Sequence, residues 1–172
     1  AVRAAHGREA DAQLAGESVH IDALSGRDLF RQVRIPKALV NFIDCPPLYA
    51  REAIYSTAPD EHLRFLALTR IAIECCQHLG FGPQILHCHD WHAAFGPLLL
   101  RALYSWDQLF AHTRSALTIH NIGYQGEFPA AAVADLDLGD NAYLLHQDDL
   151  RGGRINALKH GCMYADAVTT VS

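Results

Sequence analysis

The sequence alternates short apolar segments with longer helix-like segments from residue 39 onward, and this alternation constrains its fold more than any other feature. Segments with the apolar composition of strands are 39–43, 84–88, 115–119 and 167–171. Segments with the pattern of helices are 56–80, 91–104 and 154–164. Strands joined by crossovers of about a dozen residues or more pair in parallel, and parallel sheets are buried on both faces. We therefore predict an α/β fold with a mostly parallel sheet and helices on both of its faces.

The residues before this alternating region have a different pattern. Residues 1–17 are polar and rich in alanine, and they predict no defined element. Residues 18–24 and 29–35 each alternate apolar and polar side chains, and residues 25–28 between them are typical of a turn. This pattern predicts a β-hairpin near the start of the chain, which Pro36 ends.

The composition is that of one globular domain, and it argues against two classes of partner. The 172 residues carry a formal charge of −5, and 50% of them are hydrophobic. A weakly acidic protein lacks the basic face that binding to nucleic acid requires. No apolar run approaches the roughly 20 residues that span a bilayer. We therefore expect neither a nucleic acid nor a membrane as a partner.

The cysteines and the two ends of the chain indicate where the protein acts and how complete it is. The five cysteines form no CxxC pair, and the N-terminus has no apolar segment typical of a secretory signal. Free thiols are typical of reducing compartments, which predicts a cytoplasmic protein. Residue 1 is not Met, and the apolar run 167–171 reaches the end of the chain without a polar tail. These two features predict that the sequence is a fragment.

The site is expected at one edge of the sheet, because ligands of open parallel sheets bind beyond the carboxyl ends of the strands. Four segments follow predicted strands, namely 44–47, 87–92, 120–125 and Ser172. The second and third carry most of the side chains that are suited to catalysis or binding. We therefore expect these two segments to form the site.

The first of these segments, residues 87–92, allows three interpretations. Its histidines suggest a metal-dependent hydrolase built on His87, His89 and His92, although the order differs from the HxHxDH pattern and no further ligand pair follows at a usual spacing. Alternatively, Asp90 caps a helix that begins near Trp91, while the histidines pack at the strand end. In the third interpretation, Asp90 and at least one histidine face a substrate. The residues alone leave these alternatives open.

The second segment, residues 118–126, places a histidine and an asparagine at the tip of a strand, followed by a loop with two glycines. His120, Asn121, Tyr124 and Gln125 are neutral donors and acceptors, which suits the recognition of hydroxyl groups. Tyr124 can also stack on the face of a sugar. The segment predicts a site for a polyhydroxylated ligand, the alternative being a structural loop with a satisfied histidine.

At these motifs the sequence resembles the N-terminal domain of bacterial glycogen synthases and plant starch synthases, the family 5 glycosyltransferases. The resemblance extends over residues 39–172, with the motifs in family order and at family spacing. Its most specific part is the pair formed by HDWH at 89–92 and TIHNIGYQG at 118–126. The other matching stretches are IDCP and LY within 43–49, D-x-x-x-RF at 60–65, and LK-x-G and YADAVTTVS within 158–172.

The resemblance implies a GT-B architecture, in which two Rossmann-like domains flank the active site and this chain is the N-terminal half. It implies transfer of glucose from ADP-glucose to the non-reducing end of an α-1,4-glucan with retention. The partners would be the nucleotide sugar, the glucan acceptor and the C-terminal domain of the same protein. ADP-glucose would be a substrate, and no cofactor or catalytic metal is expected.

The resemblance also assigns residue roles. His120 matches the histidine of the family's catalytic centre, which contacts the transferred glucose, and Asp90 matches a carboxylate near the same sugar. Substrate-binding positions are Asn121, Tyr124 and Gln125 on the glucose and acceptor side and Tyr55 near the nucleotide.

Two parts of the family pattern have no counterpart here. The Lys-Thr-Gly-Gly-Leu loop and the C-terminal domain, whose cations bind the pyrophosphate, are both absent from the sequence. Because electrostatic stabilisation of the leaving group is a large catalytic effect, we expect the 172 residues alone to be inactive. A non-catalytic glucan-binding protein with the same loops is the alternative.

Overall fold

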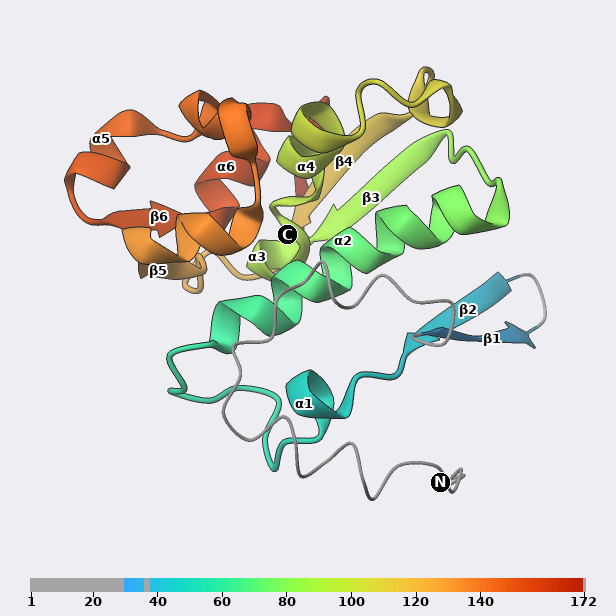
Figure 1. Cartoon of the computed structure of the whole chain (residues 1–172), viewed down its shortest axis with the longest axis horizontal. Coiled ribbons are helices and arrows are strands. Elements are labelled where there is room, and N and C mark those ends of the chain that lie inside the picture. The colour runs from blue at the N-terminus through green and yellow to red at the C-terminus, as the bar shows by residue number, and fades with distance from the viewer. Residues whose placement is uncertain (1–29, 36–37, 172) are drawn as a thin grey trace. The chain divides into compact units, whose positions relative to one another are not determined.

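The computed structural model describes residues 30–35 and 38–171, and the chain divides into two compact units, Ala1–Glu52 and Ala53–Ser172 (Figure 1). Residues 1–17, for which the sequence predicts no defined element, lie outside the described residues. The two units are described separately below.

The described part of the first unit is a β-hairpin followed by one short helix. Strand β1 (Phe30–Ile35) pairs antiparallel with β2 (Ala38–Ile43), with Phe30 opposite Ile43. Helix α1 (Pro46–Tyr49) follows. The hairpin near the start of the chain is thus confirmed, but its strands differ from the prediction.

The difference between the predicted and observed hairpins lies at Pro36. The sequence predicted that Pro36 ends the hairpin, whereas the described strands before and after it, β1 and β2, pair with each other. Residues 36–37 themselves lie outside the described residues. Segment 39–43 is therefore a hairpin strand paired with β1, and not the first strand of the parallel sheet. Residues 18–28 of the predicted hairpin lie outside the described residues.

The second unit contains the predicted parallel sheet. Its strands are β3 (Ile85–His89), β4 (Arg114–Ile119) and β7 (Ala167–Thr170), in the order β3-β4-β7. His89 lies opposite Thr118, and Ile119 lies opposite Thr170, so the strands end at the same edge of the sheet. The crossovers between them contain helices, as the alternating pattern predicted (Figure 1).

The helices before β4 follow the predicted segments with two differences. Helix α2 (Glu61–Leu79) begins later than predicted and ends at Gly80, which adopts the left-handed φ of 60° typical of a helix end. The segment predicted as one helix over 91–104 forms α3 (Asp90–Ala93) and α4 (Gly96–Leu103). Pro97 lies in the first turn of α4 and lacks the amide hydrogen that a continuous helix would use.

The remaining elements are mostly short. After α4 the chain forms η2 (Gln108–Phe110), and between β4 and β7 it forms β5 (Glu127–Pro129), η3 (Ala130–Leu136), η4 (Gly139–Leu144), α5 (Gln147–Arg151), β6 (Arg154–Asn156) and α6 (Ala157–Tyr164). The predicted helix 154–164 begins only at Ala157, because its first residues pair antiparallel with β5. Figure 1 shows β5, β6, α5 and α6 gathered on one side of β3 and β4.

Two glycines allow helices to approach the sheet closely. A Cβ on Gly96 would lie 2.6 Å from the Cys88 sulfur of β3, and a Cβ on Gly161 would lie 2.8 Å from a Leu117 methyl group of β4. Helices α4 and α6 therefore cover the face of the sheet that carries Cys88 and Leu117. On the opposite face, His87 and His89 are exposed within the described part of this unit. None of the described helices is both long and apolar enough to cross a membrane.

Candidate functional site

The two polar segments predicted to form the site meet at the carboxyl ends of β3 and β4. Asp90 directly follows β3, and His120 directly follows β4. The loop between β4 and β5, His120–Gly126, begins at this edge of the sheet, and we call it the site loop. The contacts at its start and at its end are different in kind.

At the start of the site loop, the Asp90 carboxylate accepts two backbone hydrogen bonds. Its Oδ1 accepts from the amide of His120 at 2.7 Å and from the amide of Asn121 at 3.1 Å. Asp90 has a φ of 53°, a left-handed conformation that costs about 1 kcal/mol for a residue other than glycine. The residue with this backbone conformation is thus the one whose carboxylate links the end of β3 to the end of β4.

The prediction that Asp90 caps the following helix is wrong. The N-cap of α3 is His89, and no side chain accepts a capping hydrogen bond there. Asp90 lies in the first turn of this helix, where a negative charge is favourable. Its carboxylate oxygen is directed to the amides of the site loop instead.

The histidines at this edge form a row of three imidazole rings. Nδ1 of His89 lies 3.0 Å from Nε2 of His120, within hydrogen-bond distance. The His87 ring lies beside the His89 ring at a centroid distance of 4.2 Å, and its Nε2 is 2.7 Å from the Thr118 hydroxyl. Partial desolvation of the ring, followed by the nearby rings of His87 and His120, lowers the pKa of His89 below its ordinary value, which favours the uncharged ring.

The middle of the site loop is a tight turn with exposed side chains. The Asn121 side-chain oxygen accepts a hydrogen bond from the Gly123 amide at 2.9 Å, which is the geometry of an Asx turn. Ile122 and Tyr124 are 63% and 68% exposed. The turn therefore presents an aromatic ring and a side-chain amide at the surface of the unit.

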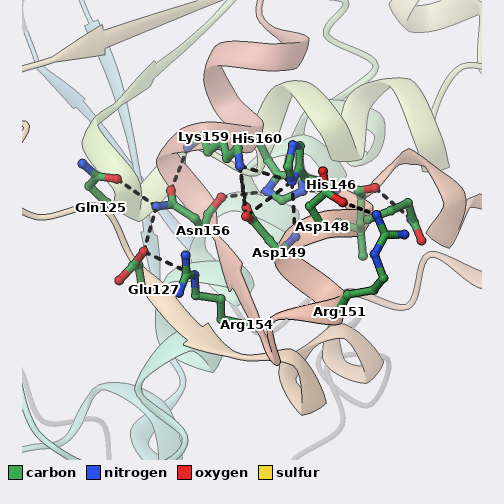
Figure 2. Close-up of polar contacts among 12 residues, drawn as sticks. Gln125, Glu127, His146, Asp148, Asp149, Arg151, Arg154, Asn156, Lys159 and His160 are labelled. Atoms are coloured by element: carbon green, nitrogen blue, oxygen red, sulfur yellow. Dashed lines mark hydrogen bonds and ion pairs between the residues drawn. The ribbon is translucent and has the colours of Figure 1, made fainter.

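The end of the site loop is held by the first turn of α6. The amides of Ala157 and Leu158 donate to the carbonyls of Gly126 and Gln125 at 2.9 Å and 3.0 Å. The Gln125 side chain accepts from Asn156 Nδ2 at 2.8 Å and donates to the carbonyl of Ile122 at 3.3 Å. Figure 2 shows the Gln125 and Asn156 side chains directed toward each other. The helix amides that lack a partner within α6 thus bind the loop.

Asn156 belongs to a larger polar network that Figure 2 draws between α5, β6 and α6. Its Oδ1 caps α6 by accepting from the Lys159 amide at 2.8 Å. The buried His160 donates from Nδ1 to the Asn156 carbonyl at 2.7 Å and accepts at Nε2 from the His146 amide at 3.0 Å. Lys159 Nζ contacts both oxygens of Asp149 at 2.9 Å and 3.0 Å and lowers the pKa of that carboxyl.

An aromatic cluster packs beneath the end of the loop. Gly126 has a φ of 64°, and a Cβ there would lie 2.6 Å from a ring carbon of Trp91. The Trp91 ring contacts the rings of Phe65, His92 and Phe128, at centroid distances of 4.7 Å, 4.2 Å and 5.7 Å. The residue after Asp90 therefore supports one end of the loop while Asp90 holds the other.

The remaining predicted site residues have other surroundings. Tyr55 is 59% exposed, and its ring contacts are with His92 at 5.6 Å and Phe65 at 6.3 Å. His92 packs in the aromatic cluster and not in the row formed by His87 and His89. Within residues 30–35 and 38–171, no three histidine, cysteine or carboxylate side chains are grouped as metal ligands. The arrangement of the three histidines thus differs from the one that the metal-dependent hydrolase requires.

Sequence reasoning did not single out Asn156. Asn156 lay inside the predicted helix 154–164, so the sequence did not reveal that it is the N-cap of α6. Its contact with Gln125, 31 residues away, depends on the pairing of β5 with β6, which the sequence did not predict.

Comparison with known proteins places these motifs in a family context. Residues 9–172 match the family model described as the starch synthase catalytic domain. A glycogen synthase of Koribacter versatilis is 42% identical over 135 residues, which is 76% of this chain and 28% of the relative. A glycogen synthase of Elusimicrobium minutum is 37% identical over 138 residues, covering 78% of this chain and 28% of the relative.

A solved structure supports the same relationship. The catalytic domain of starch synthase IV from Arabidopsis thaliana, bound to ADP and acarbose, matches with a TM-score of 0.71 and 32% identity. The match covers 83% of this chain and 30% of the starch synthase chain. The chain thus spans less than a third of the length of these relatives.

Proposed function

The chain belongs to the family of starch synthase catalytic domains, and we propose that it forms part of a retaining glycosyltransferase that transfers glucose from ADP-glucose to the non-reducing end of an α-1,4-glucan. The observation that carries this proposal is the convergence of Asp90, His120 and Asn121 at adjacent strand ends. ADP in the related starch synthase structure supports the choice of donor nucleotide.

His120 and Asp90 act on the side of the transferred glucose. The exposed His120 ring offers a hydrogen-bonding ring nitrogen to a sugar hydroxyl. The Asp90 carboxylate holds the amides of His120 and Asn121 and places a negative charge near the position where an oxocarbenium-like transition state develops positive charge. No metal or other cofactor is part of this proposal.

The rest of the site loop recognises the substrate through neutral groups. Tyr124 stacks on a sugar ring, and Asn121 donates from its side-chain nitrogen, because its oxygen is engaged by Gly123. Gln125 contributes by fixing the loop, since its amide bonds to Asn156 and to the carbonyl of Ile122. Tyr55, in the aromatic cluster, lies on the nucleotide side.

The leaving ADP requires positive charge that the site loop does not supply. The side chains of His120–Gly126 include no lysine or arginine. Phosphate groups are stabilised by cations or by helix amides, and the α6 amides of Ala157 and Leu158 already bind the loop. We therefore propose that other parts of the catalytic domain bind the pyrophosphate, and that the 172-residue chain alone does not catalyse glucose transfer. We further propose that the protein acts in the cytoplasm.

A hybrid enzyme tests this function. In the Koribacter versatilis glycogen synthase, the matched segment is replaced by the corresponding residues of this chain, and transfer of labelled glucose from ADP-glucose to glycogen is measured. We expect activity in the hybrid and none in the 172-residue chain. A folded hybrid that binds glycogen without transferring glucose would contradict the proposal and favour a glucan-binding role. Turnover by the chain alone would contradict the expectation that the site is incomplete.

A further inference from the structure

His89 is the one side chain that bonds to the imidazole ring of His120 within the described residues. His89 is the last residue of β3, and His120 directly follows β4, the parallel neighbour of β3. The 3.0 Å distance joins Nδ1 of His89 to Nε2 of His120. Of the two ring nitrogens of His120, Nε2 is therefore the one that is engaged by the part of the chain that the structure describes.

The ring of His89 packs against the ring of His87. His87 lies two residues earlier on the same strand, and alternation along the strand puts both side chains on the same face of the sheet. The rings of His87 and His89 are 4.2 Å apart between centroids and tilted by 36°. His87 is in turn bonded to Thr118, whose hydroxyl lies 2.7 Å from that of Thr169 on β7. A polar row across all three strands thus supports the position of His89.

The contact has a chemical consequence. A neutral imidazole carries one proton, and a hydrogen bond at one ring nitrogen decides which nitrogen carries it. If His89 and His120 are both neutral, a single proton lies between Nδ1 of His89 and Nε2 of His120. The tautomers of the two rings are then coupled: if Nδ1 of His89 donates, Nδ1 of His120 carries the proton, and if Nδ1 of His89 accepts, Nδ1 of His120 is an acceptor.

We propose that His89 is a positioning residue that fixes the orientation and the tautomer of His120, so that Nδ1 of His120 is the ring atom offered to the sugar. This proposal rests on the proposed function only for the identity of the ligand as a sugar. The contact between the two rings, and its effect on the protonation of His120, are properties of the chain itself.

Two amide substitutions at position 89 distinguish positioning from simple loss of the ring. The side-chain amide of asparagine reaches the place of the imidazole Nδ1, whereas that of glutamine reaches the place of Nε2. His89→Asn therefore keeps a polar atom facing His120, and His89→Gln removes it while retaining an amide of similar size. His112→Gln serves as the control, because His112 is an exposed histidine at a different place, just before β4.

The first measurement is long-range proton–nitrogen NMR of the 172-residue chain with labelled histidine, in which the ring shifts report the tautomer. His120→Gln assigns the signals of His120. We expect one tautomer of His120 in the unsubstituted chain, the same tautomer in His89→Asn, and a mixture in His89→Gln. Circular dichroism verifies that each variant is folded. His120 shifts that are unchanged in His89→Gln would overturn the proposal.

The kinetic consequence is measured in the hybrid enzyme. Loss of a hydrogen bond that orients the ring should lower kcat by about tenfold in His89→Gln, with little change in KM for the glucan. His89→Asn should restore most of the turnover, and His112→Gln should not differ from the unsubstituted hybrid. An inactive unsubstituted hybrid would count against the proposed function, while the NMR experiment would still decide the role of His89.

Discussion

The two ends of the site loop are held by different kinds of contact. At its start, His120 and Asn121 are exposed, and a carboxylate and an imidazole from the neighbouring strand end bind them. At its end, Gly126 packs on Trp91, and Gln125 bonds to the buried Asn156, which is 6% exposed. The residues proposed to act on the sugar thus lie at the start of the loop, and the buried contacts that stabilise it lie at its end. We expect substitutions at the two ends to separate turnover from folding.

The largest effect is expected at the start of the loop. His120→Ala in the hybrid enzyme should lower kcat by about a thousandfold, as expected when a group that binds the reacting sugar is removed. Because the ring is exposed, the melting temperature should change by no more than about 2 °C. Glucose transfer and thermal denaturation measure the two quantities on the same preparation. A large loss of stability would instead support the structural interpretation of this histidine.

The next effect is expected at the end of the loop. Gly126→Ala must place a Cβ 2.6 Å from Trp91 at a φ of 64°, so the free energy of unfolding should fall by about 3 kcal/mol. Urea denaturation of the 172-residue chain measures this loss.

Gly153→Ala provides the matched control for Gly126→Ala. Gly153 has a φ of 77°, with nothing within 4 Å of its added Cβ, so this variant carries only the conformational cost of about 1 kcal/mol. The difference between the two variants is the cost of the contact with Trp91. Equal losses would show that this contact does not hold the loop.

A smaller effect is expected at Asn156, which both caps α6 and binds Gln125. Asn156→Ala removes both contacts and should lower the free energy of unfolding by about 2 kcal/mol. Asn156→Ser keeps an oxygen that accepts from the Lys159 amide but removes the nitrogen that donates to Gln125, so it should cost about 1 kcal/mol. Denaturant unfolding distinguishes them. Asn141→Ala is the control, because this asparagine side chain also donates a hydrogen bond, to the Ala102 carbonyl, but that bond does not involve the site loop.

The smallest effect is expected from pH. Burial lowers the pKa of His160 below its ordinary value of 6.5, although the Asn156 carbonyl partly offsets this. The unfolded chain then binds a proton more readily than the folded chain as the pH falls. The stabilisation is complete above about pH 6.5 and is lost as the pH falls through the folded-state pKa.

Thermal melts between pH 8 and pH 5 should therefore show a melting temperature that is constant at first and then decreases. His160→Gln should have a lower melting temperature at pH 8, because it fills the buried site less well, but a shallower decrease toward pH 5. The pKa values of His89 and His92 are also lowered by burial, so part of the decrease should remain in this variant. An unchanged slope in His160→Gln would contradict the assignment.

The sequence predicted the start of the site loop better than its end. Asp90, His120 and Asn121 directly follow apolar strands, and ligands bind beyond the carboxyl ends of parallel strands, so these two facts together were enough to predict that the three residues share one site. The helix predicted over 56–80 also ends where α2 ends, at Gly80, for a similarly local reason. In both cases the information lies within a few residues of the feature.

The parts that could not be predicted depend on contacts between distant residues. Residues 154–156 have a helix-like pattern, yet they form β6, because pairing with β5 outweighs a weak local preference. The sequence did not show that segment 39–43 pairs with β1 and does not join the parallel sheet, because an apolar strand pattern does not specify its partner. The bond between His89 and His120 needed the register of β3 and β4, which an apolar pattern does not specify.

The site loop is held at both ends through its own peptide groups. Asp90 binds the amides of residues 120 and 121, and α6 binds the carbonyls of residues 125 and 126, so these bonds do not involve the side chains at positions 122 and 124. Exposed positions 122 and 124 can therefore be randomised while the path of the chain is kept. Proline is the exception at 120 and 121, where the amide hydrogen is needed. Selection for a new sugar preference can thus explore many loop sequences from one scaffold without first losing the fold.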